Sequence, residues 1–354
     1  MKTAAFIGVF PILQNGHCSI FSYMLDAYDR VVIMMGSANE RLSMTNPFTY
    51  EQKKAWIEFT FERLAAAKNK PNWNQSGDQL IFIPINDFVY NNTKWESRAY
   101  AAVADVIGED AQVDLIGIQE DEASQFYLRG FPQWKQDLRE RFVDVDSETV
   151  LNEWFRNDMQ SLGKFEGDVP KYVFEQITSN PAFQPSAALE EFTFYEKEAQ
   201  ACADFPHIDY LKFNCADSVI VCKSHVLLTQ RGEAPGKGCW ALPGGYVKQG
   251  ETCHDAAMRS LFAKTNLKVP FKIISDPRNI TGEKRFDDPN RSKGIPRVTE
   301  AFYIEIDANK DGSLPKITAG ERVEKVEWVP LYKLNKMSMF EDHLGIIDYF
   351  TGAL

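Results

Sequence analysis

Four short apolar runs in the first half of the chain constrain the fold more than any other feature. They span residues 4–10, 31–35, 81–85 and 113–118, and their length and aliphatic content are typical of buried strands. Segments with helical periodicity, residues 49–67 and 95–106, separate the later runs. Strands that alternate with helices predict a doubly wound α/β domain with a parallel sheet, whose ligand crevice lies beyond the carboxyl ends of the strands.

The pattern changes in the second half of the chain. A proline-punctuated segment near residue 180 precedes an amphipathic helix expected at residues 187–203. Beyond Tyr210, one helix is predicted at residues 253–264. Predicted strands precede it at residues 218–222 and 226–230 and follow it at residues 297–306. A chain of 354 residues is long enough for two cores. We expect one domain at residues 1–180, a linker helix region at 181–208, and an α+β domain at 209–354.

Charge and cysteine content exclude several classes of function. Lys and Arg number 39 against 50 Asp and Glu, a net charge of −11, which disfavours binding to nucleic acid or an anionic membrane. The six cysteines include no C-x-x-C pair, and this indicates free thiols in a reducing compartment. The N-terminal residues lack a signal-peptide pattern, so we expect a cytoplasmic protein without a membrane span.

A motif follows the first apolar run. The segment Gly8-Val-Phe-Pro-Ile-Leu-Gln-Asn-Gly-His17 resembles the G-R-F-Q-P-F-H-x-G-H signature of archaeal-type nicotinamide mononucleotide (NMN) adenylyltransferases. Further matches occur in the same order at 36–37, 46–49, 87, 95 and 131–134. The resemblance implies a Rossmann-like nucleotidyltransferase domain, with phosphates held at a helix N-terminus. It also implies nucleotide-binding roles for Gly8, Phe10, Asn15, Gly16, Gly36, Ser37, Asn46, Asp87 and Trp95.

The cationic part of this motif is largely missing. In the family, two histidines and an arginine hold the ATP phosphates, but here Val9 replaces the arginine and Gln14 the first histidine. Two further basic elements are replaced by Ile118-Gln-Glu-Asp121 and by Leu151. Because phosphoryl chemistry depends on positioned cations, only residual catalysis through His17 and Gln14 is expected. The alternative is that His17 and the loop residues maintain local packing only.

A second motif lies in the predicted α+β domain. Residues 240–245 resemble the strand and turn before a Nudix helix, and the box G-x5-E-x7-R-E-U-x-E-E-x-G-U aligns without a gap through Gly245, Glu251 and Arg259. Taken together, nearly the whole chain resembles the bifunctional NMN adenylyltransferase/Nudix ADP-ribose pyrophosphatase family. The resemblance implies a pocket formed by Arg231, Leu242, Gly244, Gly245, Arg259 and Arg291, although an apolar-core role explains Leu242 equally well.

The metal-binding face of the Nudix helix has lost its carboxylates. Glutamates spaced i, i+3 and i+4 hold Mg²⁺ or Mn²⁺ in that family, but the three positions here are Ser260, Ala263 and Lys264. Glu251 is the one remaining candidate metal ligand and residual catalytic group, so Mg²⁺ is a weak expectation and the site is predicted to be lost. Lys264 either pairs with a ligand phosphate where a metal once lay, or is a solvated helix lysine.

These departures favour a pseudoenzyme that binds an adenine or nicotinamide nucleotide (NMN, ATP, NAD or ADP-ribose) or acts as a scaffold. The alternative is an active enzyme that makes NAD from NMN and ATP, hydrolyses ADP-ribose, or does both. A third hypothesis treats both pockets as vestigial and the chain as a component of a homo-oligomer or of a complex with a protein partner.

Overall fold

The computed structural model describes residues 1–38, 40–119, 126–140, 145–157, 159–180, 183 and 186–353. The chain packs into two compact units, Met1–Leu189 and Glu190–Leu354. The division between them falls inside the expected linker region, and the helix expected there is α7 (Ser186–Cys202). Among these residues no helix has both the length and the apolar character needed to cross a membrane.

The first unit is built on a five-stranded parallel sheet with the order β3-β2-β1-β4-β5. Its strands are β1 (Thr3–Gly8), β2 (Arg30–Met35), β3 (Leu80–Pro84), β4 (Val113–Ile118) and β5 (Lys135–Arg139). The four predicted strands and the doubly wound fold are confirmed. The fifth strand was not predicted because its sequence, Lys-Gln-Asp-Leu-Arg, is largely polar and lies at the sheet edge.

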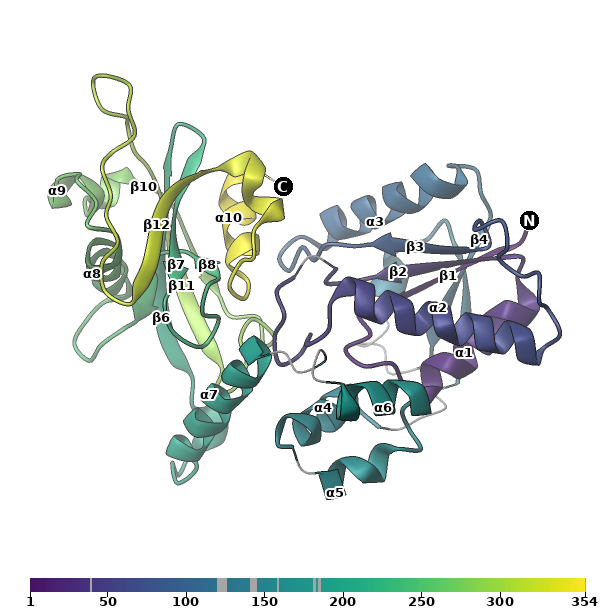
Figure 1. Ribbon diagram of the computed structural model, residues 1–354. Helices are drawn as coiled ribbons and strands as arrows, with labels where there is room; N and C mark the ends of the chain where they lie inside the picture. The colour runs from purple at the N-terminus through teal and green to yellow at the C-terminus, as the bar shows by residue number, and fades with distance from the viewer. Residues whose placement is uncertain are drawn as a thin grey trace. The chain divides into compact units, whose positions relative to one another are not determined.

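Helices cover both faces of this sheet, with α3 on one side and α1 and α2 on the other (Figure 1). They are α1 (Asn15–Ala27), α2 (Tyr50–Ala67), α3 (Asn92–Ile107), α4 (Ser147–Phe155), α5 (Met159–Leu162) and α6 (Lys171–Ser179). Thr49 caps α2, because its side chain accepts a hydrogen bond from the Gln52 backbone N–H. Because the strands are parallel and helices connect them, the carboxyl ends of the strands lie beside the N-termini of the following helices. A doubly wound fold places its ligand at this edge.

The first strand ends two residues earlier than predicted. Phe10 adopts a left-handed φ of 52° and turns its ring back into the core, where it is 2% exposed. A Cβ on Gly8 would lie 2.8 Å from the Phe10 ring, so glycine is required for this close approach. The turn after β1 is thus shaped by these two residues.

The second unit contains a seven-stranded mixed sheet. The strands are β6 (Phe213–Cys222), β7 (His225–Arg231), β8 (Trp240–Ala241), β9 (Gly244–Tyr246), β10 (Ile280–Phe286), β11 (Arg297–Glu305) and β12 (Val323–Pro330). The main order is β10-β11-β6-β7-β12, with β8 beside β7 and β9 beside β6. The expected α+β Nudix fold is confirmed. The strands β10 and β12 were not predicted, because many of their side chains are exposed.

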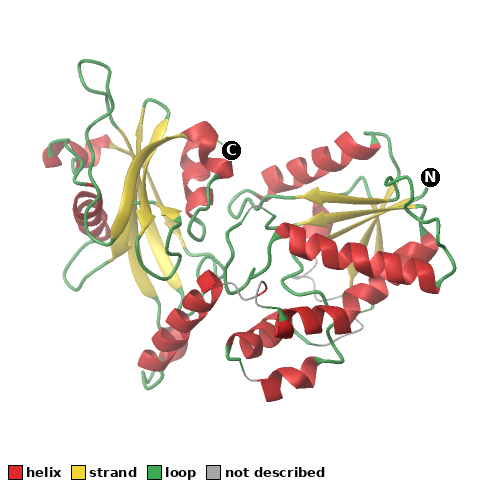
Figure 2. Ribbon diagram, in the orientation of Figure 1, coloured by secondary structure: helices red, strands yellow, loops and turns green. Residues whose placement is uncertain are grey.

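Helices flank this sheet on both sides (Figures 1 and 2). The central helix α8 (Cys253–Thr265) and the short α9 (Phe271–Ile274) lie on one side, and α10 (His343–Thr351) lies on the other. Buried side chains of α8, including Ala257 and Leu261, pack against the strands in one apolar core. This packing fixes the orientation of α8 and thereby determines which of its side chains face the neighbouring pocket.

Candidate functional site

His17 and Gln14 stabilise the start of α1. The backbone N–H of Gln14 donates a hydrogen bond to His17 Nδ1 at 3.0 Å, so a neutral imidazole carries its hydrogen on Nε2. The Gln14 side chain is buried and donates to the Val145 carbonyl at 2.8 Å. Asn15 likewise engages the protein's own backbone, because its N–H donates to the Asp168 carbonyl at 2.7 Å. Gly16 lies between Asn15 and His17 in the first turn.

A buried lysine that the sequence analysis missed lies beside this turn. Lys53, on α2, is 1% exposed, and its ammonium donates to the Val9 carbonyl and to Asn46 Oδ1, both at 2.9 Å. Burial lowers the pKa of Lys53 to about 8, although Glu40 and Asp87 act in the opposite direction. A positive charge therefore lies at the end of β1 despite the loss of the arginine at position 9.

Three of the residues matched to the NMN adenylyltransferase signature form one polar cluster around this lysine. The Ser37 hydroxyl donates to Asp87 Oδ2 at 2.6 Å, and Asn46 Nδ2 donates to the Ser37 carbonyl at 3.3 Å. Gly36 precedes Ser37 and brings the backbone close to Asp87, since an added Cβ would lie 3.8 Å from Asp87 Oδ1. The structure brings these residues together at the carboxyl edge of the sheet.

Other predicted positions in this unit have a packing role. Trp95 packs against the core, with its ring centroid 5.8 Å from that of Phe131. Leu151, at the expected arginine position, is buried at 2% exposure in α4. Val9 is 39% exposed. Glu120 and Asp121 lie outside the described residues, and of the acidic segment only Ile118 and Gln119 are described.

The second unit contains a cavity of about 590 Å³, here called the C-terminal pocket. All six pocket residues suggested by the Nudix resemblance line it, together with Ser260, Ala263 and Lys264 of α8. Its basic lining residues are Arg231, Lys248, Arg259, Lys264, Arg291, Arg297 and Arg322, and its acidic ones are Asp217, Glu233, Glu321 and Glu341. The pocket wall thus carries seven cationic and four acidic side chains.

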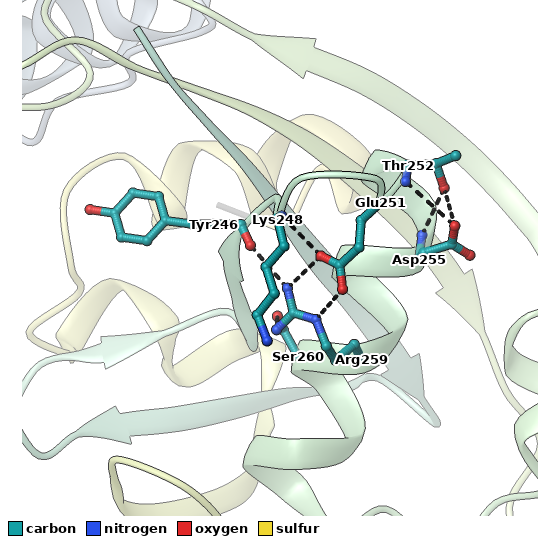
Figure 3. A network of polar contacts seen from close by, with 7 residues as sticks. All are labelled: Tyr246, Lys248, Glu251, Thr252, Asp255, Arg259 and Ser260. Carbon is teal, nitrogen blue, oxygen red and sulfur yellow. Dashed lines mark hydrogen bonds and ion pairs between the residues drawn. The ribbon is translucent and has the colours of Figure 1, made fainter.

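Glu251 is held by an arginine of the same motif. Its carboxylate accepts hydrogen bonds from Arg259 Nε at 2.6 Å and Arg259 Nη2 at 2.8 Å, as Figure 3 shows. It also accepts the backbone N–H of Lys248 at 3.0 Å. These interactions, first the Arg259 hydrogen bonds, lower the pKa of Glu251 to about 2. The remaining carboxylate of the Nudix motif is therefore already occupied by a cation of the protein.

Lys264 differs from Arg259, Arg291 and Arg297 of the pocket wall, which form ion pairs, and from Lys248, which is exposed. Lys264 lies near the end of α8 and is partly buried, and across the described residues its ammonium makes no hydrogen bond or salt bridge. Burial and the neighbouring Arg231 lower its pKa, whereas Asp217 raises it. Asp217 is itself buried and accepts a hydrogen bond from the Thr299 hydroxyl at 2.5 Å. Lys264 is therefore a partly buried lysine of the pocket wall.

Buried polar contacts fix the remaining walls. Arg291 forms a two-point ion pair with Asp342, at 2.8 and 3.0 Å, and both side chains are at most 3% exposed. His343 accepts the Leu242 backbone N–H at 2.9 Å, and burial lowers the pKa of this imidazole to about 3, so it is neutral. The Arg231 guanidinium lies 4.0 Å from the ring centroid of Phe340.

Close approach of the backbone also shapes the pocket. A Cβ on Gly244 would lie 1.7 Å from Asp217 Oδ1, which excludes any other residue at this turn without rearrangement. Of the described residues, no three His, Cys, Asp or Glu side chains are grouped as a metal site would require.

Each unit of the chain is similar in sequence to known proteins. A NUDIX domain profile matches residues 213–350. The nicotinamide/nicotinic acid mononucleotide adenylyltransferase of Acinetobacter baylyi is 30% identical over 173 residues, which cover 49% of this chain and 80% of that protein. The ADP-ribose pyrophosphatase of Methanocaldococcus jannaschii is 29% identical over 134 residues, or 38% of this chain and 70% of that protein.

Nearly the whole chain also resembles solved structures. The bifunctional NMN adenylyltransferase/ADP-ribose pyrophosphatase of Francisella tularensis, solved in complex with AMP and a manganese ion, has a TM-score of 0.80 and 23% identity. The match covers 99% of this chain and 98% of that one. At this level of identity the resemblance establishes the fold, with both units represented in a single chain.

Proposed function

Since the chain belongs to the family of NMN adenylyltransferases that carry a Nudix ADP-ribose pyrophosphatase domain, we propose that it is a pseudoenzyme of that family. It binds a nucleotide of the ADP-ribose class in the C-terminal pocket and does not cleave it. Its first unit retains the nucleotidyltransferase fold without efficient adenylyl transfer.

One observation carries this proposal: α8 presents Ser260, Ala263 and Lys264 to the pocket where a metal-dependent site needs carboxylates. Divalent cations such as Mg²⁺ and Mn²⁺ favour oxygen donors, above all carboxylates. Glu251 does not supply the missing ligands, because Arg259 already holds both of its oxygens. The residues present do not fit a divalent ion, and the pocket therefore lacks a means to activate water against a diphosphate.

Binding is compatible with the same pocket. Its volume of about 590 Å³ falls within the usual range for small-molecule sites. Guanidinium groups suit phosphates, and the exposed ring of Tyr246 in the wall offers a stacking surface for a base or sugar. Loss of the catalytic face thus leaves the features that recognise a nucleotide.

The first unit supports the same conclusion. Gln14 and Asn15 hydrogen-bond to the protein's own backbone, and His17 accepts the Gln14 N–H. The cationic Lys53 is bound to internal oxygens. Each absent transition-state donor typically costs about 3 kcal/mol of catalysis, so loss of several leaves little adenylyl transfer.

The test measures turnover of NMN plus ATP and, separately, of ADP-ribose, with Mg²⁺ or Mn²⁺. We expect neither NAD formation nor ADP-ribose cleavage by the unmodified protein. Rates of about 1 s⁻¹ or faster would overturn the proposal, because they lie within the ordinary enzyme range. A Ser260→Glu/Ala263→Glu/Lys264→Glu variant, checked for folding by thermal unfolding, is expected to gain metal-dependent ADP-ribose cleavage. The same variant assayed with a chelator is its control.

A further inference from the structure

We infer that Lys264 supplies the positive charge that metal-dependent pockets take from a divalent cation, so that the C-terminal pocket binds a nucleoside diphosphate without any metal ion. The inference rests on the proposed function, because it specifies how the ligand of that pocket is held. It assigns Lys264 the role of a ligand-binding cation and predicts a chelator-resistant complex.

Three arginines that line the same cavity as Lys264 are already paired with carboxylates of the protein. Arg259, Arg291 and Arg297 each form an ion pair with a carboxylate, namely Glu251, Asp342 and Glu198. Lys264 lines the same cavity, and its ammonium forms no hydrogen bond or salt bridge with any residue of the range 190–353. A partly buried charge without a partner is costly, and a bound anion would offset that cost.

The charge of the wall is the second argument. Of the seven Lys and Arg side chains in the wall, Arg259, Arg291 and Arg297 are each offset by an ion-paired carboxylate, so the charge that matters is the charge close to Lys264. Arg231 and Arg322 both lower the pKa of Lys264 through their own positive charge, so the three cations repel one another. A bound diphosphate between these three cations would offset their mutual repulsion.

The position of Lys264 is the third argument. It occupies a face of α8 together with Ser260 and Ala263, neither of which carries charge. An ammonium on a flexible stem acts as a compact point charge with three donors, which suits non-bridging phosphate oxygens. Ala263 leaves room beside it, because its side chain ends at Cβ.

A competing explanation gives Lys264 a purely structural role as the counter-charge of buried Asp217. The two groups interact, since each shifts the pKa of the other toward its charged form. That explanation predicts that removal of the ammonium lowers stability and leaves ligand affinity unchanged. Ligand titrations and unfolding measurements therefore separate the two roles.

The experiment titrates the full-length protein with ADP-ribose by calorimetry, in a chelator and in Mg²⁺. We expect affinities within about twofold of each other in the two buffers. Lys264→Met is expected to weaken binding at least tenfold in both, whereas Lys264→Arg retains most of the affinity. Lys268→Met is the matched control, because Lys268 is an exposed lysine that follows α8 and does not line the pocket.

The outcomes distinguish the inference from the proposed function. Binding that is lost in chelator and regained in Mg²⁺, or a folded Lys264→Met variant with unchanged affinity, would overturn the inference alone. Cleavage of ADP-ribose in the titration cell, or no binding in either buffer at millimolar ligand, would overturn the proposed function and the inference with it.

Discussion

Each unit holds a lysine within its candidate site, and the two ammonium groups differ in their surroundings. Lys53 is almost completely buried and donates to the Val9 carbonyl and to Asn46 Oδ1. Lys264 is partly buried, and in the described part of the second unit its ammonium has no hydrogen-bond partner. A cation held by the protein's own oxygens maintains the fold, whereas a cation left unpaired in a cavity is available to a ligand.

The largest expected effect is loss of stability when Lys53 is removed. Lys53→Met leaves the Val9 carbonyl and Asn46 Oδ1 without their shared donor, and we expect a loss of about 3 kcal/mol in the free energy of unfolding. Denaturant unfolding measures this change. Lys54→Met is the matched control on the same helix, because Lys54 forms a partly exposed ion pair with Glu58 and should cost less than about 1 kcal/mol.

Near-equal losses for the two variants would contradict the structural role of Lys53. They would mean that other groups satisfy the turn after β1, and the contrast between the two units would then lose its basis.

A pH titration of stability gives the next effect in size. The pKa of Lys53 is about 8 in the folded state, against an ordinary value of 10.5. Between these values the unfolded chain binds one more proton than the folded chain, so stability should rise with pH. Relative to Lys53→Met, the unmodified protein should gain about 2 kcal/mol between pH 8 and 9.5. A flat or falling difference would show that the folded lysine keeps an ordinary pKa.

The sequence predicted the strands better than it predicted the roles of the polar residues. Continuous apolar runs identified β1 to β4, because burial on both faces requires them. The sheet edge β5 and the partly exposed β10 and β12 lack such runs. Edge strands follow from pairing with distant segments, which a single sequence does not specify.

The two lysines illustrate the same limit at the candidate sites. Lys53 lies in an ordinary helical pattern, and its burial depends on the convergence of a carbonyl from the turn after β1 with the amide of Asn46. No local spacing signals that convergence. Lys264 was identified because the Nudix frame marks its position, yet sequence left open whether it is solvated or faces a ligand. Packing of α8 on the sheet, which a single sequence does not specify, places Lys264 in the pocket wall.

The smallest expected effect is on stability when Lys264 is replaced. Lys264→Met removes an ammonium that Arg231 and Arg322 repel, because all three groups carry positive charge. It places a flexible apolar side chain in the same space. It also removes an attraction to Asp217, which opposes this gain. We expect the two contributions nearly to cancel, with a change of less than about 1 kcal/mol in the free energy of unfolding without ligand. Thermal and denaturant unfolding of both lysine variants, side by side, provide the measurement. A loss for Lys264→Met as large as that for Lys53→Met would make Lys264 the structural counter-ion of Asp217, and both lysines would then serve the fold.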